Sequence, residues 1–132
     1  MADTHATIVS GDRNYLHTVS VGGREFAVDE PPALGGGGQG AAPYDLYLAA
    51  LAACTAITLR MYAERKGWEL GRLRAELHMH RAADGRMHIH RRLHASGSLD
   101  EAQWRRLLEV VENTPVTRTM REGATITSER AG

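Results

Sequence analysis

The sequence lacks the features that define several common classes of protein. It has a single cysteine, so no internal disulfide can form and a disulfide-stapled secreted scaffold is excluded. Its 16 basic residues balance its 16 acidic residues, so there is no positive excess for binding nucleic acid. Residues 1–10 lack a basic segment followed by an apolar run, so no signal peptide is expected.

Length and hydropathy narrow the class further. The 132 residues fit one compact domain, and we predict a single domain over residues 1–132. The longest apolar stretch, residues 46–59, is shorter than the roughly 20 residues that span a bilayer. We therefore expect a soluble cytoplasmic protein that binds neither nucleic acid nor membrane.

The first forty residues predict three strands and a loop. Residues 6–9, 16–21 and 25–28 are separated by glycine turns and form an expected antiparallel meander. Residues 35–40 then contain five glycines and the pattern G-x-G-x-x-G. A dinucleotide site needs this pattern inside a βαβ unit, with an acidic residue about 20 positions later on a second strand. Those later positions lie in a predicted helix, so we expect a flexible loop in front of that helix.

A long helix is predicted over Pro43–Lys66. Proline suits its first turn, alanine and leucine dominate it, cations crowd its end, and Gly67 stops it. Its middle is apolar on every side, and such a helix is buried on every side. A chain this small would need strands and a second subunit to cover it, which indicates a dimer.

Residues 73–95 alternate with period two and break at residues 83–85, which predicts a hairpin. A three-residue loop with Gly85 in the left-handed conformation gives a register with two distinct faces. One face carries Leu77, Met79, Ile89 and Leu93, and the other carries His78, His80, His88 and His90. The histidines could bind zinc, but arginines share their face, so a solvated face is favoured and no metal site is expected.

The last third predicts helical segments and a strand. Ser98 and Glu101 match a capping box that opens a helix through Glu112, with apolar residues at helical spacing. Pro115 cannot extend that helix, residues 116–120 predict a short helical turn, and residues 124–129 predict a strand. Strands, a long helix, a hairpin, a helix and a strand make an α+β fold.

Cys54 is the one nucleophile in an unusual setting. A thiol in the middle of an apolar helix is most often a small hydrophobic residue that fills a core. Burial without a neighbouring cation also makes a thiol inert, so reactivity requires a basic residue brought close by the tertiary structure. Both interpretations stay open from the residues alone.

Three segments resemble the OsmC/Ohr family: residues 31–36, residues 43–56 with their Pro-led apolar helix around a cysteine, and residues 114–119. The resemblance implies an intertwined homodimer in which strands wrap two long central helices. It also implies reduction of organic hydroperoxides without a cofactor. In active members a peroxidatic cysteine becomes a sulfenic acid, a second cysteine resolves it as a disulfide, and a dithiol reduces the disulfide.

Carried onto this chain, the resemblance places Cys54 at the peroxidatic position. It gives Arg13 the role of the active-site arginine, from its spacing to Pro31. The second family cysteine is replaced by Thr114, which cannot form a disulfide. The glutamate that partners the arginine in the hydroperoxide-resistance branch is replaced by Tyr44, which resembles the general OsmC-like branch.

Three functional hypotheses follow. The first is a one-cysteine peroxidase for organic hydroperoxides, regenerated by an external thiol or dithiol. The second is a protein without peroxidase turnover that binds a small molecule or senses oxidative stress at the dimer cleft. In the third, Cys54 only fills the core and the histidine face makes a protein or metal contact.

Overall fold

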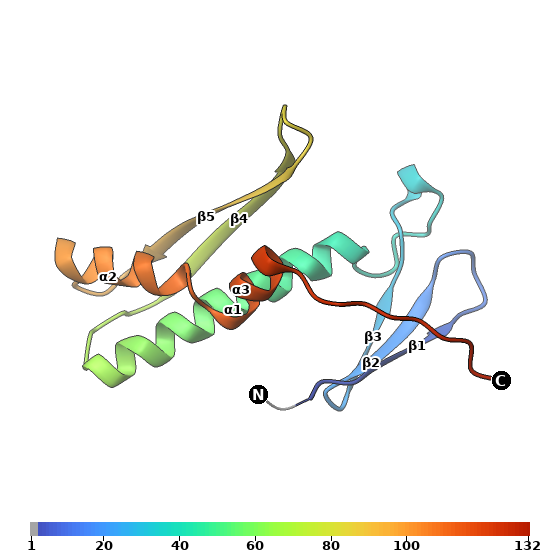
Figure 1. Ribbon diagram of the computed structural model, residues 1–132, viewed down its shortest axis with the longest axis horizontal. Coiled ribbons are helices and arrows are strands. Elements are labelled where there is room, and N and C mark those ends of the chain that lie inside the picture. The colour runs from blue at the N-terminus through green and yellow to red at the C-terminus, as the bar shows by residue number, and fades with distance from the viewer. Residues whose placement is uncertain (1–2) are drawn as a thin grey trace. The chain divides into compact units, whose positions relative to one another are not determined.

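The computed structural model describes residues 3–132, and its contacts divide the chain into two compact units, of which the first ends at Tyr47 and the second spans Leu48–Gly132. The first unit is built on a three-stranded antiparallel sheet in the order β1-β2-β3 (Figure 1). Its strands are β1 (Ala6–Ser10), β2 (His17–Val21) and β3 (Arg24–Val28). The predicted meander is confirmed.

The glycine-rich segment closes one end of this sheet. It follows the short helix η1 (Pro32–Leu34), and the buried Asp29 carboxylate accepts hydrogen bonds from the backbone N–H groups of Glu30 (2.8 Å), Gln39 (3.1 Å) and Gly37 (3.2 Å). A Cβ atom on Gly36 would overlap the Glu30 carbonyl. The loop does precede a helix, as predicted, and two of its backbone N–H groups are bonded to Asp29; its flexibility stays a prediction.

The long helix α1 (Pro43–Lys66) has the predicted bounds and continues through the second unit. The hairpin of β4 (Leu73–Arg81) and β5 (Met87–Ala95) follows it, then α2 (Glu101–Val111) and α3 (Pro115–Glu122). The core of this unit joins α1 to the hairpin and α2. Its buried members are Leu59, Ala63, Leu70, Leu107 and Val111.

The hairpin register agrees with the sequence pattern. Gly85 has a φ of 82°, the left-handed conformation that the three-residue loop requires. His80 pairs with His88 and His78 with His90, so the histidines share one face of the hairpin. The predicted two faces are confirmed.

The predicted start of the helix after the hairpin is wrong. The cap of α2 is Asp100, whose carboxylate accepts from the Gln103 backbone while the Gln103 side chain accepts from the Asp100 backbone. The expected cap at Ser98 comes too early because Gly97 still donates a backbone hydrogen bond to Leu70, which keeps the chain extended there.

Residues 124–129 form no strand in the described chain, and Ile126 is 86% exposed. A β-branched run becomes a strand only where another strand offers a ladder of hydrogen bonds, and none does so here. The prediction of a last strand at residues 124–129 is therefore wrong.

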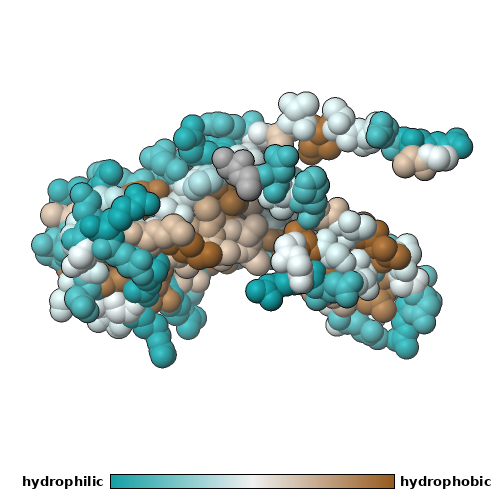
Figure 2. All heavy atoms as spheres, turned by 90° about the horizontal axis from the view of Figure 1, so that it is seen from below, coloured by the Kyte–Doolittle hydropathy of each residue, from teal (hydrophilic) through white to brown (hydrophobic). Residues whose placement is uncertain are grey.

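Helix α1 is only partly covered by its own chain. Its buried residues, Leu51, Thr55, Leu59 and Ala63, form one stripe, whereas Ile57 is 55% and Met61 53% exposed. The space-filling view likewise shows apolar surface on the chain (Figure 2). Within one chain, α1 is therefore not buried on every side. The second subunit that would cover its exposed side stays a prediction.

By length and composition, α1 could also cross a membrane: an 18-residue window within it has a mean hydropathy of 1.5. The expectation from residues 46–59 that the apolar stretch is too short is therefore wrong. The core helix of a soluble protein meets the same criterion.

Candidate functional site

Cys54 lies beside the buried stripe of α1. Its thiol is free and half-buried, and Sγ is 3.9 Å from the hydroxyl oxygen of Thr58, one helical turn along. The next residue, Thr55, is fully buried and donates its hydroxyl to the Leu51 carbonyl at 2.7 Å. The thiol therefore stands at the border between the interior of the second unit and its surface.

A half-buried guanidinium reaches the residue next to Cys54. Arg91 on β5 donates from Nη1 to the hydroxyls of Thr55 and Thr117, each at 3.0 Å, and from Nη2 to the Val111 carbonyl at 3.0 Å. This side chain links α1, the hairpin, the end of α2 and the start of α3.

The pKa of Arg91 lies below the ordinary arginine value, and burial of the side chain is the main cause. The carboxylate of Glu112 raises that pKa, the charge of Arg121 lowers it, and a charge on Cys54 raises it. The Glu112 carboxylate is itself paired with Arg121 at 2.8 Å.

Thr114 is fully buried at the N-cap of α3, and its correspondence to the second family cysteine stays a prediction. Its hydroxyl oxygen lies 2.6 Å from that of Thr117, which in turn accepts from Arg91. Among residues 3–132, no buried side-chain polar atom lacks a hydrogen-bond partner. The Thr114 hydroxyl therefore belongs to one satisfied polar network that runs from α3 to the neighbour of Cys54.

Arg13 lies in the first unit, between β1 and β2, and is exposed. Its charge contributes, after three backbone hydrogen bonds led by that of Gln39, to holding the pKa of Asp29 below its ordinary value. Since Cys54 belongs to the second unit, the pairing of Arg13 with Cys54 stays a prediction. Tyr44 is exposed, and the Asp45 carboxylate accepts from the backbone N–H of Ala42 at 3.0 Å, a capping contact.

The histidine face is exposed and its rings lie stacked. The centroids of His78 and His80 are 5.1 Å apart, and those of His80 and His88 are 5.9 Å apart. Across the described residues 3–132, no three histidine, cysteine, aspartate or glutamate side chains come together in a way that could hold a metal ion. The four histidine side chains are exposed on the hairpin.

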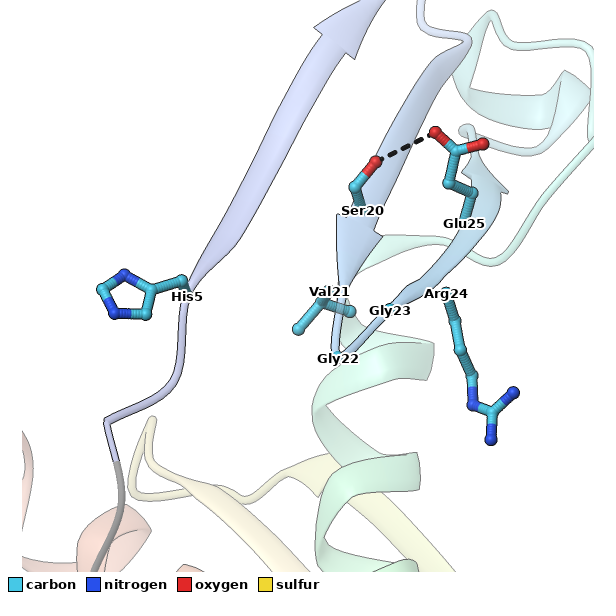
Figure 3. A pocket seen from close by; sticks show the side chains of 7 residues that line it. All are labelled: His5, Ser20, Val21, Gly22, Gly23, Arg24 and Glu25. Atoms are coloured by element: carbon cyan, nitrogen blue, oxygen red, sulfur yellow. Dashed lines mark hydrogen bonds between the residues drawn. The ribbon is translucent and has the colours of Figure 1, made fainter.

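The first unit carries a hollow of about 360 Å³ at the turn between β2 and β3 (Figure 3). The hydroxyl of Ser20 donates to Glu25 there at 3.2 Å, and the Arg24 side chain extends away from that pair. Its lining is His5, Ser20, Val21, Gly22, Gly23, Arg24 and Glu25. It includes neither Cys54 nor Arg13.

Arg91 is the site residue that reasoning from the sequence missed. The signal was available: the predicted register puts residue 91 on the apolar face, opposite Leu77. An arginine among inward-facing apolar residues needs buried hydrogen-bond acceptors, which marks it as structurally or functionally special.

Comparisons with known proteins agree on the fold. The family profile described as OsmC-like protein matches residues 36–129. A solved structure from Psychrobacter arcticus 273-4, named for the osmotic stress and detoxification responses, is 20% identical with a TM-score of 0.76, covering 90% of this chain and 89% of that one.

Two further structures carry the name organic hydroperoxide resistance protein. That of Legionella pneumophila is 23% identical with a TM-score of 0.65, covering 92% of this chain and 90% of its own. That of Elizabethkingia anophelis, solved with thiocyanate bound, is also 23% identical with a TM-score of 0.65, covering 92% and 89%. At these identities the likeness shows the fold alone. No curated protein sequence matches the chain.

Proposed function

Because this chain belongs to the OsmC-like protein family, we propose that it is a thiol-dependent peroxidase that reduces organic hydroperoxides through Cys54. The observation that carries the proposal is the free, half-buried thiol of Cys54 on the long helix of this fold, with a guanidinium bonded to the adjacent Thr55. Two proteins of the same fold are named for resistance to organic hydroperoxides.

The chemistry needs one thiolate and one external reductant. The Cys54 sulfur attacks the terminal oxygen of the hydroperoxide, the O–O bond breaks, and the leaving alkoxide takes up a proton to become an alcohol. Cys54 is left as a sulfenic acid. A first external thiol condenses with it and releases water, and a second thiol reduces the mixed disulfide and restores Cys54.

The external reductant follows from Thr114. A hydroxyl forms no disulfide, and this one is buried and bonded to Thr117. Cys54 is also the only cysteine in the sequence. The oxidised sulfur therefore has no second cysteine to pair with in its own subunit, and a second copy offers none apart from its own Cys54. A small thiol or dithiol must therefore reach Cys54 itself.

We propose a cytoplasmic homodimer in which the second copy covers the exposed side of α1, where Ile57 and Met61 lie. Apolar surface on a helix of this length favours burial against another copy. Arg13 is proposed as the family arginine that acts at the cysteine.

The deciding experiment follows loss of an organic hydroperoxide with excess dihydrolipoamide, wild type beside Cys54→Ser. The proposal expects many turnovers in the wild type and none in the variant, with both proteins folded to the same oligomeric state. An equal rate in the two proteins would refute a role for the cysteine.

The second candidate is a binding or sensing protein without turnover. It is favoured by the same Thr114, since loss of the resolving position removes the internal route back from the sulfenic acid. Consumption of at most one equivalent of hydroperoxide per Cys54, with no regeneration by dihydrolipoamide, would support this function over the peroxidase.

A further inference from the structure

Four exposed histidines share one face of the hairpin, and the proposed peroxidase reaction uses none of them. His78 and His80 lie on β4, and His90 and His88 lie directly opposite them on β5. We propose that His80 and His88 chelate a divalent ion of the zinc, nickel and copper group, with water in the remaining coordination positions. This site is independent of the proposed function, because none of its ligands belongs to α1.

The strand register brings His80 and His88 together. They are directly opposed in the antiparallel ladder, so their Cβ atoms lie roughly 4.5–5.5 Å apart and their side chains leave the same face. Their ring centroids are 5.9 Å apart. A zinc ion with two imidazole nitrogens at about 2.0–2.1 Å puts the ring centres roughly 5–6 Å apart. The two rings therefore already have the separation that a shared metal ion requires.

The rings must turn before their nitrogens converge on one ion. They are stacked with 26° between their planes, and the nitrogen lone pairs of stacked rings point sideways rather than at a point between them. The torsion that turns a histidine ring is broad, and both side chains are exposed, so the rotation costs little. The site uses two protein ligands, and it therefore needs no group of three ligating side chains, of which residues 3–132 contain none.

Asp84 makes the kind of outer contact that a metal-binding histidine commonly has. Its Oδ1 lies 3.5 Å from His88 Nε2, and the same oxygen accepts a hydrogen bond from the backbone N–H of Arg86 at 2.9 Å, which fixes the carboxylate. A carboxylate beside one ring nitrogen favours the proton on that nitrogen and leaves the lone pair on the other. His88 therefore ligates through Nδ1, and Asp84 orients its ring.

His80 has a second imidazole neighbour in His78. The centroids of these two rings are 5.1 Å apart, with 16° between the planes, and both side chains leave the same face of β4. Among the described residues, the ion pairs place a carboxylate beside His88 and none beside His78 or His80. Because a carboxylate partner makes an imidazole a better ligand, the metal ion takes His88 as the second ligand of His80.

Arginines on the same face oppose a divalent cation. Arg74 lies 3.6 Å from the carboxylate of Glu76, and Arg92 is the cross-strand pair of that glutamate, so both stand beside a negative charge. Arg86, closer to the histidine pair, is exposed, and water screens the repulsion between exposed charges. The repulsion lowers the affinity for the metal ion but leaves the nitrogen ligands in place.

The test titrates the full-length protein with Zn²⁺ alone at pH 7.5 by isothermal calorimetry, in wild type, His80→Gln, His88→Gln and Asp84→Asn. His94→Gln is the matched control, because His94 lies on the same face of β5 but has Glu76 Oε1 3.0 Å from its Nε2. Cys54→Ser is the second control, since a thiolate also binds zinc. Mg²⁺ is the second probe, because it prefers oxygen ligands to imidazole.

We expect one Zn²⁺ per chain and no binding of Mg²⁺. His80→Gln and His88→Gln should each weaken Zn²⁺ binding by about tenfold or more, at least the loss that removal of an outer partner causes. Asp84→Asn should give a smaller loss, and His94→Gln and Cys54→Ser should bind as wild type does. Since all the substituted hairpin side chains are exposed, the circular dichroism of these variants should match that of wild type.

A second measurement needs no variant. Wild type is modified with diethyl pyrocarbonate, with and without Zn²⁺, and the modified histidines are located by mass spectrometry. Zn²⁺ should protect His80 and His88 and leave His94 reactive. Wild type that binds no Zn²⁺, an equal loss of affinity in His94→Gln, loss of binding in Cys54→Ser, or equal protection of all three histidines would each overturn the proposal. Hydroperoxide turnover tests the proposed function separately.

Discussion

The hydroxyl oxygens of Thr114 and Thr117 lie 2.6 Å apart at the start of α3, both buried. The pair ends a chain of hydrogen bonds that passes through Arg91 to Thr55, next to Cys54. Thr114 thus completes a polar network that reaches the residue next to Cys54.

This relationship makes Thr114→Cys an informative variant. It restores a thiol at the predicted resolving position, so one equivalent of hydroperoxide should convert the sulfenic acid of Cys54 into an internal disulfide. Loss of the hydroxyl from the buried bond to Thr117 should cost about 1 kcal/mol of folding free energy. Thiol counting and mass spectrometry of the oxidised protein measure the outcome.

The control is Thr119→Cys, which places a thiol on an exposed position of the same helix. It should give no internal disulfide with Cys54. A persistent sulfenic acid in Thr114→Cys would show that position 114 does not face the cysteine.

The proposed dimer can be tested on α1. Ile57 is 55% exposed within one chain, so Ile57→Glu would place a charge in the interface if a second copy covers this side. We expect the variant to sediment as a monomer, or to form a dimer only at much higher concentration. Glu64→Gln, a change at an exposed polar position of the same helix, should leave the assembly as it is. A wild type that sediments as a monomer would contradict the proposal directly.

Core packing distinguishes two adjacent leucines of α2. Leu107 is fully buried among Leu59 and Val111, whereas Leu108 is 50% exposed. Leu107→Ala should lower the free energy of unfolding by roughly 2–5 kcal/mol, because it leaves a cavity, and Leu108→Ala should cost clearly less. Urea unfolding of the two variants measures the difference. Similar losses would mean that the exposed leucine is covered in the assembled protein.

The Asp29 carboxylate should make stability depend on acid. In the folded state the pKa of Asp29 lies below the ordinary aspartate value, chiefly because its carboxylate accepts a hydrogen bond from the backbone N–H of Gln39. The N–H groups of Glu30 and Gly37 and the charge of Arg13 lower the pKa further. The stabilisation is therefore complete above the ordinary aspartate pKa, near 4, and is lost as the pH falls through the lower folded value. Thermal melting between neutral pH and pH 3 measures it.

Asp29→Asn should melt at a lower temperature than wild type at neutral pH and should lose less on acidification, because it has no carboxylate to protonate. Glu25→Gln, an exposed carboxylate of the same sheet, serves as the control. A wild type and an Asp29→Asn variant with parallel pH profiles would contradict the role given to Asp29.

Local signals accounted for most elements. Pro43 and Gly67 bracket α1, and strict alternation with Gly85 at the turn fixes which residues of β4 and β5 pair. These features depend on backbone preferences and on which side chains share a face. Both are determined by residues that are close together in the sequence. The cysteine at the centre of the helix could be singled out for the same reason.

The sequence alone therefore determined the α+β class, the bounds of the long helix and the hairpin register. The tertiary structure decided the site around Cys54, because Arg91 meets Thr55 and Thr117 across separations of 36 and 26 residues. It also decided that residues 124–129 find no strand partner in the described chain. Contacts between distant segments depend on how whole elements pack, and no local pattern carries that information.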